Sequence, residues 1–264
     1  MAGGDVTIQA VIDLVIREHG GRMWRTVDGV KAGDPRRPVA GVVTTFLATG
    51  AVIKRAAELR ANLIITHEPI FYGHKDETGW LEDDPVYRAK RRLLDEHRIV
   101  VCRFHDYLHR DVRRDGFYLG MAEALGWEPD PERPFLCSIR PTSLARLARL
   151  LKKRLHLQAI RVVGDPRMTC RRVALMVGAS GMRSHVEALN DFQADVVVCG
   201  EVREWETVEY ARDARELGVG KALIVVGHAN SEEVGMARLA GWLRQRIPAV
   251  PVTHVPAGDP FRVM

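Results

Sequence analysis

Histidine and carboxylate residues follow three apolar, strand-like segments of this 264-residue chain. They are His67 and Glu68 after residues 61–66, His105 and His109 after residues 99–104, and His228 after residues 222–226. Imidazole nitrogen and carboxylate oxygen are the ligands that zinc, iron and manganese take in proteins. Because binding sites in α/β sheets gather at the carboxyl ends of strands, these residues predict a divalent-metal site.

His228 and Glu232 are four residues apart, and Ser231 and Glu232 open a helix-like segment. If the helix begins near His228, both side chains lie on one helical face and can hold the same ion. The alternative is that Glu232 only stabilises the start of the helix through the helix dipole, while His228 caps a turn.

His67 and Glu68 leave their strand as neighbours in the sequence. Both can reach one ion, or two adjacent ions, where the backbone turns sharply. Pro69 favours such a turn, because it restrains Glu68 and ends the ladder of strand hydrogen bonds. A loop histidine beside a surface carboxylate is the alternative interpretation.

The segment 104–115 holds the densest group of candidate ligands in the chain. Asp106 and His109 are both suitable as the ligand from this segment, and the residue types do not decide between them. Arginines lie in the same segment, so an exposed network of salt bridges is the alternative.

The order of the expected elements indicates an α/β fold built from two similar lobes. Strands are expected at 39–44, 61–66, 99–104, 173–177, 194–199 and 222–226, and helices at 7–19, 50–59, 85–96, 143–155, 183–192 and 231–244. Residues 57–68 and 190–201 align without a gap, each ending in a glutamate, and strand–helix–strand order is kept around both. This weak repeat favours two related lobes.

The proline-rich stretch 128–142 is the best candidate for a boundary between the lobes. We therefore predict a first lobe of residues 1–128 and 226–264, which carries most of the metal ligands. Residues 129–225 form the second predicted lobe.

Composition favours an ordinary cytoplasmic protein. The sequence is 46% hydrophobic and 28% charged, and its four cysteines include no CxxC pair, which disfavours a zinc ribbon or a redox motif. The start of the chain lacks a signal-peptide pattern, and no apolar run approaches the roughly 18 residues that suggest a membrane span. We expect no membrane contact.

The helix at 143–155 is strongly basic and is a candidate surface for nucleic acid. The formal net charge of +5 also permits such binding. Its basic residues are Arg146, Arg149, Lys152, Lys153 and Arg154. Leucines at helical spacing on the same segment give a simpler explanation, in which one face is buried and the other solvated. No aromatic residue interleaves with these charges, which disfavours a platform for stacking single-stranded bases.

The chain resembles the NGG-one-interacting-factor-three family, whose members are often named GTP cyclohydrolase 1 type 2 homologues. The resemblance covers nearly the whole length and rests on several segments in combination. These are residues 28–33, LIITHEP (63–69), the histidine turn at 105–109, VALMVGASG (173–181), ADVVVCGE (194–201), GHANSEEVG (227–235) and 259–261.

The resemblance implies two divalent metal ions in a cleft between two α/β lobes, and subunits that assemble into a toroidal homohexamer. It implies that His67, His228 and Glu232 are metal ligands. The chain has Glu68 where the family usually has a second histidine, and His109 where it usually has an aspartate. Both replacements can bind metal, so we expect a rearranged site, with zinc, iron or manganese as the candidate ions.

The function implied by the resemblance is binuclear metal-dependent hydrolysis of a nucleotide-like or other small substrate. Glu68, Glu201 or Glu204 is then the candidate general base, and Glu204 stands where the family has a histidine. The alternative is a metal-binding assembly or partner-binding ring without turnover, with nucleic acid as one less favoured partner. The chain lacks a P-loop, a GxGxxG after a strand and a GxSxG, so those site classes have no support.

Overall fold

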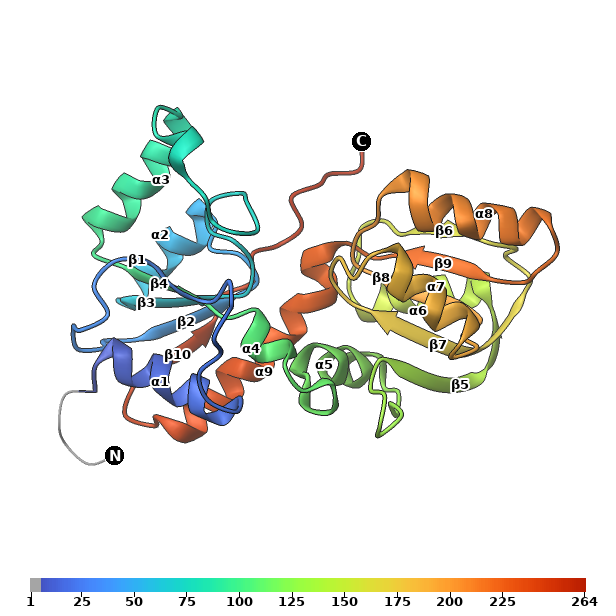
Figure 1. Ribbon diagram of the computed structural model, residues 1–264, viewed down its shortest axis with the longest axis horizontal. Helices are drawn as coiled ribbons and strands as arrows, with labels where there is room; N and C mark the ends of the chain where they lie inside the picture. The colour runs from blue at the N-terminus through green and yellow to red at the C-terminus, as the bar shows by residue number, and fades with distance from the viewer. Residues whose placement is uncertain (1–5) are drawn as a thin grey trace. The chain divides into compact units, whose positions relative to one another are not determined.

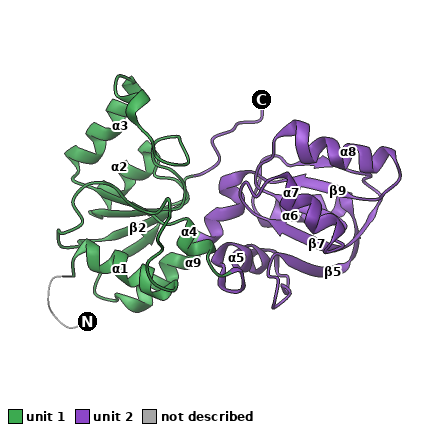
Figure 2. Ribbon diagram, viewed as in Figure 1, with its two compact units in different colours: residues 1–111, 236–257 green, residues 112–235, 258–264 purple. Residues whose placement is uncertain are grey.

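The computed structural model describes residues 6–264 and divides them into two compact α/β units (Figure 2). Unit 1 contains the chain up to Asp111 together with Met236–Ala257, and unit 2 contains Val112–Gly235 together with Gly258–Met264. Each unit has its own five-stranded sheet. The predicted α/β class is confirmed.

The sheet of unit 1 has the strand order β1-β4-β3-β2-β10 (Figure 1). Its strands are β1 (Gly29–Ala32), β2 (Val42–Thr45), β3 (Leu63–Thr66), β4 (Val100–Arg103) and β10 (Val252–His254). Strand β1 is antiparallel to β4, and the other neighbours are parallel. Because β2, β3 and β4 run in parallel, their carboxyl ends meet at one edge of the sheet. All three strands are buried on both faces.

Helices cover both faces of the unit 1 sheet (Figure 1). They are α1 (Ile8–Glu18), α2 (Gly50–Glu58), α3 (Pro85–Glu96), the short α4 (Asp106–His109) and the second part of α9 (His228–Arg246), with a 3₁₀ turn at Gly79–Leu81. Ile53 of α2 and Leu94 of α3 join Ile64 of β3 in one core cluster. On the opposite face, the Thr44 hydroxyl donates to the Met236 carbonyl oxygen at 2.9 Å.

The sheet of unit 2 has the order β5-β7-β8-β9-β6, in which β7, β8 and β9 are parallel and both edge strands are antiparallel. Its strands are β5 (Leu136–Ser143), β6 (Arg161–Val163), β7 (Thr169–Met176), β8 (Val196–Cys199) and β9 (Ala222–Val225). Its helices are α5 (Gly116–Leu125), α6 (Leu144–Arg154), α7 (Met182–Asn190), α8 (Glu209–Glu216) and the start of α9, with a 3₁₀ turn at Val112–Arg114 and a π-helical turn at Glu204–Val208. Leu189 of α7 and Ala211 of α8 pack with Val197 in the core.

The two sheets share one arrangement around their central strands. In unit 1, Val42, Leu63 and Val100 are register partners across β2, β3 and β4. In unit 2, residues 173, 196 and 222 are the register partners across β7, β8 and β9. Residues 63 and 196 occupy matching positions in the two aligned sequence segments, so the weak repeat corresponds to equivalent strands.

The unit boundaries differ from the predicted lobes. Residues 112–128 belong to unit 2 because α5 packs against strand β7 and helix α6. Residues 226–235 also belong to unit 2, where the Ser231 hydroxyl accepts a hydrogen bond from the Gly178 amide. The stretch expected to be a boundary instead contains the edge strand β5, with Pro141 at an irregularity in its pairing with β7.

Burial agrees with the simpler interpretation of the basic helix. All four cysteines are free and buried. Helix α6 buries Leu144, Leu147 and Leu151, and its basic residues are exposed. Among residues 6–264, no helix combines the length and the apolar character required to cross a membrane.

Candidate metal centre

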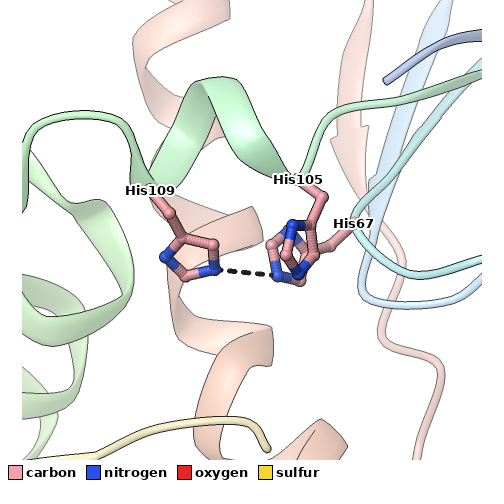
Figure 3. Close-up of side chains that lie close together, drawn as sticks. All are labelled: His67, His105 and His109. Atoms are coloured by element: carbon pink, nitrogen blue, oxygen red, sulfur yellow. Dashed lines mark hydrogen bonds between the residues drawn. The ribbon is translucent and has the colours of Figure 1, made fainter. Parts of the chain in front are cut away.

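Three histidines of unit 1 lie together where β3 and β4 end (Figure 3). His67 follows β3, and His105 and His109 lie at the two ends of the short α4 segment. One ring nitrogen from each histidine lies within 4.8 Å of the other two. His67 Nε2 and His109 Nε2 lie 3.2 Å apart, and the His67 and His105 rings stack with centroids 4.7 Å apart.

The second ring nitrogen of His67 fixes its tautomer. His67 is fully buried, and its Nδ1 lies 3.0 Å from the Phe104 carbonyl oxygen. A carbonyl can only accept, so Nδ1 carries the proton and Nε2 keeps its lone pair in the neutral ring. This is the usual state of a metal-binding histidine, in which the other nitrogen donates to a carbonyl.

His105 is oriented in the same way by Asp106. Its Nδ1 lies 2.9 Å from Asp106 Oδ1, which leaves Nε2 of the neutral ring as a lone-pair donor 3.8 Å from Glu68 Oε1. Asp106 also accepts hydrogen bonds from the Val27 amide and the Thr26 hydroxyl. Burial raises the pKa of Asp106, but these hydrogen bonds, that from His105 foremost, lower it more. Asp106 therefore orients His105, and His109 is the residue beside His67.

A partly buried carboxylate, Asp28, holds the first turn of α4. Asp28 accepts hydrogen bonds from the backbone amides of His105 at 2.6 Å and Tyr107 at 2.9 Å. Burial is the largest influence on its carboxyl group and raises the pKa, while these amide hydrogen bonds act in the opposite direction. Asp28 was not predicted as a site residue, and its place in the 28–33 segment was the only signal in the sequence.

Glu68 lies between His105 and an arginine that the sequence analysis did not identify. Its Oε2 is 3.3 Å from Arg103 Nη2, and the Arg103 side chain is fully buried. The signal was an arginine inside the otherwise apolar strand 99–104. Ring nitrogens of three histidines therefore lie close together with the Glu68 carboxylate beside His105, and this donor set fits a borderline divalent cation.

Unit 2 brings together three of the predicted residues, His228, Glu201 and Glu232. His228 Nδ1 lies 3.2 Å from Glu201 Oε2, and His228 Nε2 lies 3.0 Å from Glu232 Oε2. Helix α9 begins at His228, so the predicted common face of His228 and Glu232 is present. His228 therefore contacts one buried carboxylate, that of Glu232, and one exposed carboxylate, that of Glu201.

Two glycines allow the backbone of unit 2 to approach this group closely. Gly178 has a φ of +66°, and a Cβ atom there would collide with the Glu232 carboxylate. A Cβ atom at Gly200 would lie 2.6 Å from Ser231 Oγ, which accepts from the Gly178 amide and donates to the His228 carbonyl. Gly178 therefore provides a close approach of the backbone to the Glu232 carboxylate.

Glu204 belongs to neither of these two groups of side chains. It is exposed at the start of the π-helical turn and pairs with Arg161 at 3.0 Å. Of the predicted residues, the structure therefore brings together His67, Glu68 and His109 in unit 1. It brings together Glu201, His228 and Glu232 in unit 2. The expectation that both groups share one site stays a prediction.

The model of the Duf34/NIF3 (NGG1p interacting factor 3) family matches residues 8–259. A Clostridium perfringens protein named GTP cyclohydrolase 1 type 2 homolog is 24% identical over 247 residues, 88% of this chain and 89% of that protein. A Campylobacter jejuni protein of the same name is 27% identical over 206 residues, 77% of each chain.

Solved structures share the fold over nearly the whole chain. A Bacillus cereus protein related to NIF3 has a TM-score of 0.82 at 17% identity, covering 99% of this chain and 100% of that chain. Reduced HcgD from Methanocaldococcus jannaschii has a TM-score of 0.69 at 17% identity, covering 94% of this chain and 97% of that chain. At such identities these likenesses establish the fold alone.

Proposed function

The chain belongs to the Duf34/NIF3 (NGG1p interacting factor 3) family, and we propose that it binds divalent metal ions for the hydrolysis of a small, nucleotide-like substrate. The observation that carries this proposal is the convergence of ring nitrogens from His67, His105 and His109. Three imidazoles with a carboxylate at hand are a donor set for zinc, iron or manganese.

The proposed ligands are His67, Glu68 and His109 in unit 1 and His228 and Glu232 in unit 2, with two ions in all. His105 joins this set, because its Nε2 keeps a lone pair while Asp106 holds its Nδ1. A divalent ion, when bound, supplies Lewis-acid chemistry: it polarises an electrophile and lowers the pKa of a water molecule.

The residue best suited to act as general base is Glu201. A carboxylate that acts as general base must be able to reach a water molecule, and Glu201 is exposed beside His228. The other two candidates have cationic partners, Arg103 for Glu68 and Arg161 for Glu204. We therefore assign proton abstraction to Glu201.

The substrate class comes from the names of the relatives. Those named GTP cyclohydrolase 1 type 2 homolog suggest hydrolytic opening of a purine nucleotide ring, and we propose a nucleotide of this kind. A toroidal homohexamer and a cytoplasmic location remain predictions. Size-exclusion chromatography with light scattering tests the first of these.

Elemental analysis of the purified protein tests metal binding. We expect close to two divalent ions per chain in the wild type. His67→Ala with His109→Ala, and separately His228→Ala with Glu232→Ala, should each lose at least one ion. His97→Ala is the matched control, since His97 is an exposed histidine at the end of α3 and should keep the wild-type content. A wild type without metal, both as purified and after reconstitution, would refute the proposal.

The second candidate is a metal-binding assembly without turnover. The ion pairs of Glu68 and Glu204 favour it, because they occupy two of the three candidate bases. Screening the metal-loaded protein against purine nucleotides separates the two candidates: hydrolysis that is lost in Glu201→Gln supports the enzyme. Retention on DNA at low salt that falls steeply with added salt would instead indicate binding through the basic face of α6.

A further inference from the structure

Arg103 is a fully buried arginine at the carboxyl end of β4, beside the histidine group of unit 1. Its guanidinium contacts three different acceptors on the segment that follows β3. Nε donates to the His67 carbonyl oxygen at 3.1 Å, Nη1 donates to the His74 carbonyl oxygen, and Nη2 lies 3.3 Å from Glu68 Oε2. The planar, five-donor guanidinium can serve such divergent acceptors, whereas an ammonium group cannot.

The charge of Arg103 is balanced on a second side. The Asp76 carboxylate is 6% exposed, and its Oδ2 lies 3.6 Å from Arg103 Nη1 and 3.2 Å from Lys31 Nζ. A buried cation is tolerated when it is paired and hydrogen-bonded. Asp76 therefore balances the charge of the guanidinium independently of Glu68. The hydrogen bonds to the His67 and His74 carbonyl oxygens make Arg103 a fixed partner for Glu68.

The two oxygens of Glu68 then have different surroundings. Oε2 faces the fixed guanidinium, while Oε1 lies toward His105 Nε2 at 3.8 Å. A carboxylate bound through one oxygen in this way cannot rotate freely, and its other oxygen is the one directed toward the histidine group. Partners of this type around a ligand commonly contribute about 10- to 100-fold to metal affinity.

We propose that Arg103 is a positioning residue that holds Glu68 as a ligand through Oε1 alone and keeps it from acting as the general base. The inference rests on the proposed metal-binding function and deepens it, since it assigns one role to Glu68. Arg103 acts through Glu68 and the backbone of residues 67–74, and it touches neither the ion nor the substrate.

The test is a double-mutant cycle with Co²⁺ as the probe, read by visible absorption during titration of the full-length, metal-stripped protein. Arg103→Lys keeps the positive charge but loses the divergent donors. We expect about 10- to 100-fold weaker Co²⁺ binding and an altered ligand-field spectrum. In the Glu68→Gln background, the same change should alter affinity by no more than about twofold, the usual error of additivity. Equal losses in both backgrounds would overturn the proposal.

Lys90→Met is the matched control. Lys90 is also a buried cation that donates to a backbone carbonyl of the same segment, that of Ile70 at 2.6 Å. We expect this variant to lower the urea midpoint and to leave the Co²⁺ spectrum unchanged. If Arg103→Lys does not fold, Glu68→Asp replaces it, because its shorter side chain keeps the charge and loses the reach to Arg103. An unchanged Co²⁺ affinity in Glu68→Asp would overturn the proposal.

Urea unfolding of the metal-free proteins separates failure of this inference from failure of the proposed function. If Arg103 holds Glu68, the double variant should have nearly the same urea midpoint as Arg103→Lys alone, and additive shifts would overturn the inference. A wild type that binds no Co²⁺ would overturn the proposed function and the ligand role of Glu68. The positioning of Glu68 by Arg103 would still be decided by the metal-free cycle.

Discussion

Units 1 and 2 place different chemistry on equivalent strands. The central strands β3 and β8 are in matching register with their neighbours, and each is followed by a glutamate, Glu68 or Glu201. The residue before that glutamate differs: it is the buried His67 in unit 1 and Gly200 in unit 2. The repeated scaffold keeps a carboxylate at the end of its central strand, and the histidine position varies.

The two units also hold these groups by different means. Unit 1 uses charged side chains, with Arg103 bonded to the segment after β3 and Asp28 bonded to the start of α4. Unit 2 uses the absence of side chains, since Gly178 and Gly200 let the backbone approach Ser231 and Glu232. Charge pairs in unit 1 should therefore be sensitive to neutral substitutions, while unit 2 should be sensitive to added volume.

The largest predicted effect is that of Gly178→Ala in unit 2. The new methyl group would collide with the Glu232 carboxylate, and a φ of +66° adds strain of about 1–2 kcal/mol for any residue with a Cβ atom. We expect a total loss of about 3 kcal/mol in unfolding free energy, measured by urea denaturation. The control is Gly126→Ala in the same unit, which has a left-handed φ of +69° and no neighbour within 4 Å of its Cβ, so only strain should appear. Equal losses in the two variants would contradict the collision.

The next largest predicted effect is a loss of stability at acid pH, which we expect from His185 in unit 2. This fully buried imidazole lies between the hydroxyls of Ser180 at 3.0 Å and Thr207 at 2.9 Å. Burial lowers the pKa of His185 to about 4, although the nearby Glu206 carboxylate acts to raise it. Its ordinary pKa is 6.5, so the unfolded chain binds the proton first and folding is weakened as the pH falls through this window.

We therefore expect His185 to contribute a loss of about 2–3 kcal/mol in unfolding free energy between pH 6.5 and pH 4. Urea denaturation at several pH values measures this loss. His185→Gln keeps two polar side-chain atoms and removes the titration, so its stability should vary less over the same interval. An identical pH dependence in wild type and variant would assign the acid sensitivity to other groups.

A smaller effect is expected for Asp28→Ala in unit 1. The variant removes the acceptor for the backbone amides of His105 and Tyr107, and hydrogen bonds to a charged group contribute about 1.5–3 kcal/mol. We expect a loss of about 2 kcal/mol and weaker Co²⁺ binding, because His105 and His109 lie at the two ends of this turn. Asp34→Ala is the control. Asp34 is an aspartate of the same unit that also accepts a hydrogen bond from a backbone amide, that of Arg36, but it is more exposed and pairs with the Arg36 side chain. Co²⁺ binding in the control should stay at the wild-type level.

The sequence predicted the central strands of both units well, because apolar runs such as 63–66 and 196–199 are buried on both faces. It did not predict the edge strands β1 and β6, which are short and only partly buried. Ligand residues at strand ends could be predicted from type and spacing. The role of Arg103 could not, because two of its acceptors are carbonyl oxygens of His67 and His74, and backbone acceptors leave no pattern in the side chains.

The smallest predicted effect compares the helices that precede the antiparallel edge strands β1 and β6. Helices α1 and α6 have the same kind of N-cap: the Thr7 hydroxyl accepts from the Ala10 amide at 3.2 Å, and the Ser143 hydroxyl accepts from the Arg146 amide at 3.4 Å. Removing such a cap costs about 1 kcal/mol, so Thr7→Ala and Ser143→Ala should lower the unfolding free energy by similar amounts. Urea denaturation of each variant measures this. A loss in only one of them would show that the two units, although built on one strand arrangement, no longer depend equally on the helix that leads into it.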